Sequence, residues 1–120
     1  MNDHTRRAIA YIAGRIVSGT SAVSLYDHTA GRTYNFRAEF AATKIRVREI
    51  ESGSDITGAG GSGMFTITHV GNGKPVSLKL TGSAFEGFDY ETAKRYRGAV
   101  AGNSVAVQDD QHAKEFQYSI

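Results

Sequence analysis

The sequence predicts an all-β protein of about ten short antiparallel strands, arranged as five successive hairpins. Three observations lead to this prediction: an internal repeat of about 20 residues, apolar residues that alternate with polar ones, and fourteen glycines against one proline. We expect the hairpins to form a rotationally pseudo-symmetric or barrel-like meander. A β-solenoid with one coil per repeat is the alternative, because a period of this length also suits that architecture.

The repeat is defined by the residue at which each hairpin turn opens. Five segments align, and this residue moves from 27 to 49, 69, 89 and 109, at spacings of 22, 20, 20 and 20. The pattern predicts one domain over residues 1–120. Its repeats lie near 21–42, 43–62, 63–82, 83–102 and 103–120, with a possible half-repeat at 8–19 that we expect to form a first strand.

Both arms of each hairpin alternate between apolar and polar residues. Successive side chains of a strand point to opposite faces, so a period of two predicts a strand with one buried face. Before the turns the apolar residues are Val23, Leu25, Ile45, Val47, Phe65, Ile67, Phe85, Val105 and Val107. After the turns they are Tyr34, Phe36, Val76, Leu78, Tyr96, Phe116 and Tyr118.

The hairpin tips follow a common chemical pattern. Four of the five tips open on an acidic residue: Asp27, Glu49, Asp89 and Asp109. We expect each of these carboxylates to cap backbone N–H groups of its turn and to lie beside an exposed basic residue. Three tips end in a glycine that supplies a positive φ: Gly31, Gly53 and Gly73. The other two end in Ala93 and Ala113, which would adopt that conformation at a cost, so these tips are expected to be built differently.

Other glycines are assigned to two further roles. Four are expected at the return turns between hairpins: Gly19, Gly61, Gly82 and Gly102. Two replace inward-facing residues of sister repeats and would leave room inside the molecule: Gly58 and Gly98. No window shows a helical period of useful length, and residues 38–43 are the best candidate for a single helical turn.

Composition excludes several classes of protein. The chain has no cysteine, which rules out a disulfide scaffold, a thiolate metal site and a cysteine nucleophile. Its net charge of +2 does not describe a polycation. The apolar run over residues 8–13 is too short for a signal peptide or a membrane span, so we expect a cytoplasmic protein without a membrane partner.

Two short segments carry a family resemblance. Gly-Lys-Pro-Val-Ser-Leu at 73–78 and Gly-Arg-Thr-Tyr-Asn-Phe at 31–36 resemble the repeats of small bacterial β-flower proteins, and the likeness extends over residues 14–120. The resemblance implies hairpins arranged with rotational pseudo-symmetry about a centre. It implies no catalytic residue, because those families have no established activity.

The residues that could carry chemistry are few. No catalytic motif is present, so we expect no catalytic residue, no enzyme activity and no cofactor. Three histidines fall in hairpin tips, and with three tip carboxylates they are the candidate metal ligands: His28, His69, His112, Asp27, Asp89 and Asp109. The histidines occupy different positions in their tips, so the spacing does not define a shared site and a metal is not expected.

Charge is distributed unevenly along the chain. Residues 1–50 contain eight basic and four acidic residues, a net of 8 − 4 = +4, whereas the remainder has 6 − 8 = −2. Outward-facing arginines alternate with buried residues on two predicted strands. These arginines, with a nearby tyrosine, would form a surface that binds single-stranded nucleic acid. The residues of this predicted surface are Arg46, Arg48, Arg95, Arg97 and Tyr96.

The function that these observations favour is a non-enzymatic interaction or structural module. Its solvent-facing strands and tips would contact a protein partner or a second copy of the chain, because open strand edges at the ends of the sheet favour a homo-oligomer. A small basic β-domain that binds single-stranded nucleic acid is the first alternative. A metal-binding or hydrolytic protein with its site at the hairpin tips is the second.

Overall fold

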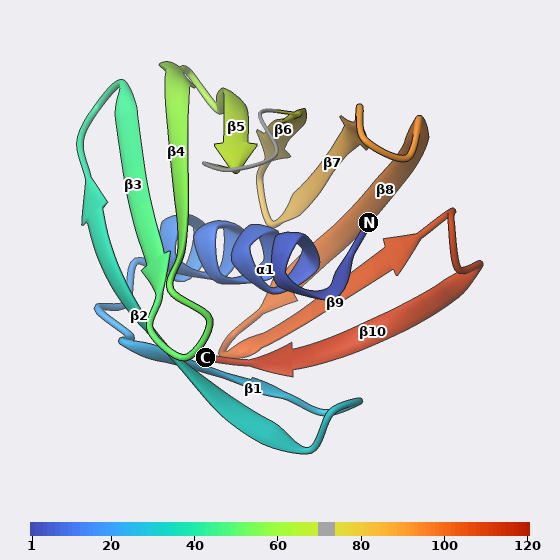
Figure 1. Ribbon diagram of the computed structural model, residues 1–120. Helices are drawn as coiled ribbons and strands as arrows, with labels where there is room; N and C mark the ends of the chain where they lie inside the picture. Colours follow the sequence, from blue (N-terminus) through green and yellow to red (C-terminus); the bar gives the residue numbers. More distant parts are fainter. Residues whose placement is uncertain (70–73) are drawn as a thin grey trace.

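The structure is a computed structural model, and it is a closed antiparallel β-barrel with a helix along its interior (Figure 1). It describes residues 1–69 and 74–120, and of His69 the backbone only. The helix α1 covers Asp3–Ser18. The ten strands within the described residues are β1 (Ser24–Asp27), β2 (Arg32–Phe40), β3 (Lys44–Glu49), β4 (Ser54–Gly61), β5 (Met64–His69), β6 (Pro75–Thr81), β7 (Ala84–Asp89), β8 (Lys94–Ala101), β9 (Ser104–Asp109) and β10 (Lys114–Ser119).

The barrel-like meander predicted from the repeat is confirmed. Each strand pairs antiparallel with its neighbours in sequence, and β1 pairs with β10 through Tyr26↔Ser119 and Asp27↔Tyr118. The alternative solenoid is therefore wrong. Closure of the barrel also removes the free strand edges that would have favoured a homo-oligomer.

The period-two pattern correctly predicted the inner face of the barrel. Nearly all of the alternating apolar residues are buried, including Leu25, Val47, Leu78 and Val105, and together they form a single core with α1. Val23, just before β1, is the exposed exception, with 67% of its surface accessible, and Phe65 is only partly buried.

The predicted first strand and half-repeat at 8–19 are wrong, because this segment is the helix α1. Every residue from 5 to 14 is buried, since the barrel wall surrounds the helix on all sides (Figure 1). Residues 8–13 are apolar at six consecutive positions, and a short run of this kind does not distinguish a helix from a buried strand. No helix among the described residues is long and apolar enough to span a membrane.

Local contacts fix both ends of α1. Asn2 is its N-cap and accepts the N–H of Thr5 at 2.9 Å. Gly19, predicted at a return turn, is instead the C-cap, with a left-handed φ of 69° and its N–H bonded to the carbonyl of Arg15. The helix therefore ends at the exposed Gly19, from which the chain turns back to enter β1.

The tip alanines adopt the same conformation as the tip glycines. Ala93 and Ala113 have φ values of 57° and 49°, beside 69° and 70° at Gly31 and Gly53. The expected cost is therefore present, but the expectation of differently built tips is wrong. The third tip, with Gly73, lies outside the described residues.

Replacing these two alanines by glycine is expected to stabilise the protein. A left-handed residue with a Cβ costs about 1–2 kcal/mol, and part of this gain is lost to the greater freedom of glycine in the unfolded chain. Ala93→Gly and Ala113→Gly should each raise the free energy of unfolding by about 0.5–1 kcal/mol in urea denaturation. Ala99→Gly, in the extended strand β8, is the control and should destabilise. Loss of stability in all three variants would contradict the prediction.

Two interior glycines make room for larger neighbours, as predicted. A Cβ at Gly58 would approach Ile67 to 2.7 Å, and one at Gly98 would collide with the ring of Phe85. Each glycine is paired directly with that residue on the next strand, so the large side chain lies over the glycine. The predicted helical turn at 38–43 is wrong, because β2 continues to Phe40 and pairs with β3 as far as Ile45.

Candidate functional site

The tip carboxylates lie inside the barrel instead of on its outer rim. As predicted, three of them cap their turns: the carboxylate of Asp27 accepts the N–H groups of Thr29 and Ala30 at 3.0 Å each, and those of Asp89 and Asp109 each accept one N–H of their own turn. The carboxylate of Glu49 instead accepts hydrogen bonds from Arg7. The predicted exposed pairs with tip lysines and arginines are wrong. All four acids are buried, with 1–6% of their surface exposed: Asp27, Glu49, Asp89 and Asp109. Because the strands alternate in direction, these tips lie at one end of the barrel and surround the start of α1.

Two arginines of α1 neutralise this buried acidic end. Arg7 forms a bidentate ion pair with Glu49, with Nε–Oε2 and Nη2–Oε1 distances of 2.9 and 2.8 Å. Its guanidinium also lies 3.8 Å from the ring centroid of Tyr34. Burial alone lowers the pKa of Arg7, but the hydrogen bonds and charge of Glu49 outweigh it and raise the pKa above its ordinary value.

The second buried charge cluster is centred on Asp109. Its Oδ2 accepts a hydrogen bond from the amino group of Met1 at 2.9 Å, and Arg6 Nη1 lies 3.8 Å away. His112 Nδ1 lies 3.0 Å from the same oxygen. Burial alone raises the pKa of Asp109, but hydrogen bonds from the amino group, His112 and the backbone of Gln111 outweigh it and lower the pKa.

The candidate metal ligands are only partly brought together. Asp109 and His112 are in contact, and Asp89 Oδ2 lies 3.7 Å from the amino group of Met1. His28 is elsewhere on the surface, where its Nε2 lies 2.7 Å from Ser119 Oγ. The side chain of His69 lies outside the described residues. Within the described part of the chain no three metal-ligating side chains converge on a common point, and the carboxylates of this end are occupied by α1.

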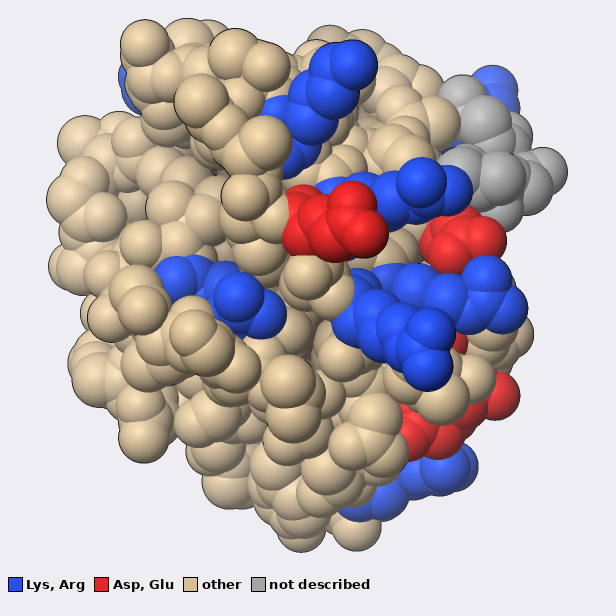
Figure 2. Space-filling model, turned by 90° about the vertical axis from the view of Figure 1, so that its left-hand side faces the viewer, with Lys and Arg blue, Asp and Glu red and all other residues tan. Residues whose placement is uncertain are grey.

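The outer wall carries a concentration of positive charge over β2 and β3, which we call the basic face. It consists of four outward side chains on these adjacent strands: Arg37, Lys44, Arg46 and Arg48. Figure 2 views this side of the molecule, where lysine and arginine side chains gather beside a few acidic ones. Arg48 forms an exposed ion pair with Asp55 at 3.2 Å. Among the described residues, Arg37, Lys44 and Arg46 have no ion pair within 4.0 Å.

The strand register places two of these arginines directly opposite each other. Arg37 of β2 is the cross-strand partner of Arg48 of β3. Like charges in directly opposed positions destabilise a sheet, and Asp55, the partner of Arg48 on β4, offsets part of this repulsion through its ion pair with Arg48. The next pair along, Glu39 and Arg46, has opposite signs.

The four arginines proposed for nucleic-acid binding do not form one surface. Arg46 and Arg48 are on β3, whereas Arg95 and Arg97 are on β8, and these strands are five places apart in either direction around the ring of ten. The two pairs therefore lie on opposite sides of the barrel. Tyr96, between the β8 arginines, faces inward, with 2% of its surface exposed, and is not available to a ligand outside.

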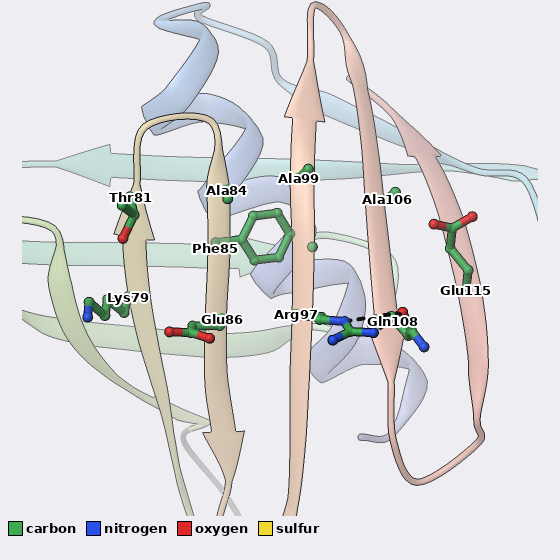
Figure 3. A pocket seen from close by; sticks show the side chains of 11 residues that line it. Lys79, Thr81, Ala84, Phe85, Glu86, Arg97, Ala99, Ala106, Gln108 and Glu115 are labelled. Atoms are coloured by element: carbon green, nitrogen blue, oxygen red, sulfur yellow. Dashed lines mark hydrogen bonds between the residues drawn. The ribbon is translucent and has the colours of Figure 1, made fainter.

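The side of the barrel opposite the basic face is hollowed. One shallow hollow of about 510 Å³ lies over β6–β10, above three small residues, Ala84, Ala99 and Ala106 (Figure 3). Beside it runs a cross-strand row of longer polar side chains: Lys79, Glu86, Arg97, Gln108 and Glu115. Lys79, Glu86 and Arg97 alternate in sign along this row, which is the favourable arrangement for cross-strand neighbours, and Arg97 also donates to Gln108 at 3.2–3.3 Å.

A second hollow of about 660 Å³, the outer groove, continues from the first over β4–β8. Its walls carry exposed apolar and aromatic side chains. Met64 and Tyr90 are 60% and 56% exposed, and the rings of Phe88 and Tyr90 meet edge to face at 4.7 Å. Arg95 lies directly across the strand pair from Phe88. In this groove two exposed aromatic rings therefore lie beside a positively charged side chain.

Sequence reasoning missed the key residues of both surfaces. Arg37 follows the buried Phe36 and so faces outward, but its position opposite Arg48 depends on the β2–β3 register, which the sequence does not show. Phe88 and Tyr90 flank the inward-facing Asp89, so they occupy outward positions in the alternation. That signal was available, because aromatic residues at outward positions are candidates for binding.

Comparison with known proteins adds no relative to this description. No protein-family model matches the chain, and neither a curated protein nor a solved structure matches it. The resemblance to β-flower proteins remains a prediction.

Proposed function

We propose that the protein is a non-enzymatic interaction module whose partner binds to the outer wall of the barrel. Barrels commonly hold small ligands in their interior. Here α1 occupies that space and packs against the wall, with the rings of Tyr11 and Phe36 stacked at 4.3 Å. The surface available for recognition is therefore the outside. A cytoplasmic location in a bacterium fits this proposal.

The partner that the basic face fits is an anionic one. The opposed pair Arg37 and Arg48 is the observation that supports this proposal, because Asp55 balances the charge of Arg48 alone and a bound anion would balance that of Arg37. The guanidinium group binds carboxylates and phosphates through two parallel hydrogen bonds, so phosphate groups or acidic side chains of a partner suit this face.

Single-stranded nucleic acid is the second candidate for this face. Lys44, Arg46 and Arg48 project outward at every second position of β3, which spaces them about 6.6 Å apart in a straight row. A row of cations suits a polymer that carries one negative charge on every unit.

Binding is expected to depend on the basic face and on salt. A fluorescently labelled 20-mer of deoxythymidine should bind at about 20 mM salt, and a polyglutamate peptide of similar charge serves as the second anionic probe, both measured by fluorescence anisotropy or competition. Arg37→Gln together with Arg46→Gln should weaken binding of the oligonucleotide at least about tenfold. The slope of the logarithm of the binding constant against the logarithm of the salt concentration should become less steep by about 0.7 for each phosphate that the variant no longer neutralises.

The matched control removes two positive charges elsewhere. Lys94→Gln with Lys114→Gln changes two hairpin tips and leaves the basic face intact. An equal loss of affinity in this variant would show that only net charge matters. Absence of binding to both probes at low salt would rule out the anionic partner.

A further inference from the structure

We propose that the outer groove is a separate site for single-stranded nucleic acid, in which a base stacks on the Phe88–Tyr90 pair and the adjoining phosphate contacts Arg95. The site shares no residue with the basic face and lies on the other side of the barrel. It therefore goes beyond the anionic partner proposed above.

The aromatic part of the groove is exposed and preorganised. Tyr90 is 56% exposed, yet its ring is held edge to face against Phe88, and its backbone N–H donates to the carbonyl of Pro75 at 3.1 Å. Met64 adds a flexible apolar side chain to the wall of the groove. Bases stack on such rings regardless of sequence, because every base presents a π-face.

The regular strand pairing beneath the groove is interrupted between β6 and β7. Their register runs from Val76↔Asp89 to Lys79↔Glu86, and the two intervening pairs are missing. Ser77 bridges this gap: its Oγ accepts the N–H of Phe88 at 2.8 Å, and its carbonyl accepts the hydroxyl of Tyr96 at 2.6 Å.

Gly87 is what permits the bridge. A Cβ at this position would collide with the carbonyl oxygen of Ser77 and lie 2.6 Å from the hydroxyl of Tyr96. The interruption of the strand pairing beside Phe88 is therefore fixed by specific residues.

The charges around the groove favour an anionic ligand. Arg95 and Lys79 face it and form no ion pair within 4.0 Å among the described residues, while Glu86 is the acidic group that faces it. Two positive side chains against one negative leave a net charge of 2 − 1 = +1 on the lining of the groove. A base on the aromatic pair would place its phosphate on the Arg95 side, because Arg95 is the direct cross-strand neighbour of Phe88.

The test separates stacking from charge. Two labelled 12-mers, deoxythymidine and an abasic chain of the same length and charge, are titrated at low salt by fluorescence anisotropy. The wild-type protein should bind the deoxythymidine oligomer at least about fivefold more tightly, since one stacked base is worth about 1–3 kcal/mol. Tyr90→Ala should abolish this difference and leave abasic binding unchanged. Arg95→Gln should weaken both oligomers.

Tyr26→Ala is the matched control, because Tyr26 is a half-exposed tyrosine on β1, outside the groove. It should keep the preference for bases. Equal affinity of wild type for the two oligomers, or equal loss in the Tyr26 and Tyr90 variants, would overturn the groove site. Base-independent binding that disappears with Arg37→Gln and Arg46→Gln would leave the basic face as the only site, and no binding of either oligomer would remove both nucleic-acid sites.

Discussion

Replacing Glu49 by glutamine is expected to lower the free energy of unfolding by about 3–5 kcal/mol. The substitution keeps the shape of the side chain but removes the charge that Arg7 meets through two hydrogen bonds inside the barrel. Arg7 would then be a buried cation beside the lumen wall. Urea denaturation measures the effect as a lower midpoint with an unchanged m-value.

The partner variants decide whether the cost arises from the unpaired charge. Arg7→Met should destabilise by a similar amount, because it leaves Glu49 buried alone, whereas Arg7→Met with Glu49→Leu should recover most of the loss. Asp55→Asn breaks the exposed pair with Arg48 and should cost less than about 1 kcal/mol. If the double variant were as unstable as either single one, shape and not charge would explain the effect.

Tyr11→Ala is the second substitution with a large expected effect, about 3–5 kcal/mol. The fully buried ring of Tyr11 stacks on Phe36 with an interplanar angle of 10°. Its hydroxyl donates to the carbonyl of Ala22 at 2.5 Å and accepts from Arg15 at 2.8 Å. Truncation would leave a cavity between helix and wall, which thermal unfolding followed by circular dichroism detects as a lower midpoint.

Tyr11→Phe separates the ring from the hydroxyl. It keeps the stack on Phe36 and should cost about 1–2 kcal/mol for the lost hydrogen bonds. Tyr90→Ala removes an exposed tyrosine and should change stability by less than about 0.5 kcal/mol. A midpoint for Tyr11→Ala equal to that of Tyr90→Ala would mean that the helix does not depend on this stacked pair.

The barrel wall could be predicted from the sequence because its information is local. Alternation at Ile45 and Val47, or at Val105 and Val107, identifies the buried face of a strand, and the turn spacing identifies the hairpins. The helix could not be predicted in this way. The run at residues 8–13 is apolar throughout, and only the complete barrel shows that it is a helix in the lumen.

The candidate surfaces depended on geometry that a single sequence does not contain. The outward direction of Arg46 and Arg95 follows from alternation and is confirmed. Their separation to opposite sides follows from closure of a ten-stranded ring, and the opposition of Arg37 and Arg48 follows from register. Glu49 looked like a solvated turn residue, because its neighbour Arg7 is 42 residues away in sequence.

Closure of the ring of strands also restricts how α1 can move out of the barrel interior. Strand pairing surrounds the helix without a break from β1 to β10, so the helix cannot slip sideways through the wall while the pairs remain formed. Amide hydrogens near the end of a chain usually exchange quickly with solvent because termini fray. The amides of residues 6–14 are instead shielded by the wall, so their exchange requires the opening of the barrel itself.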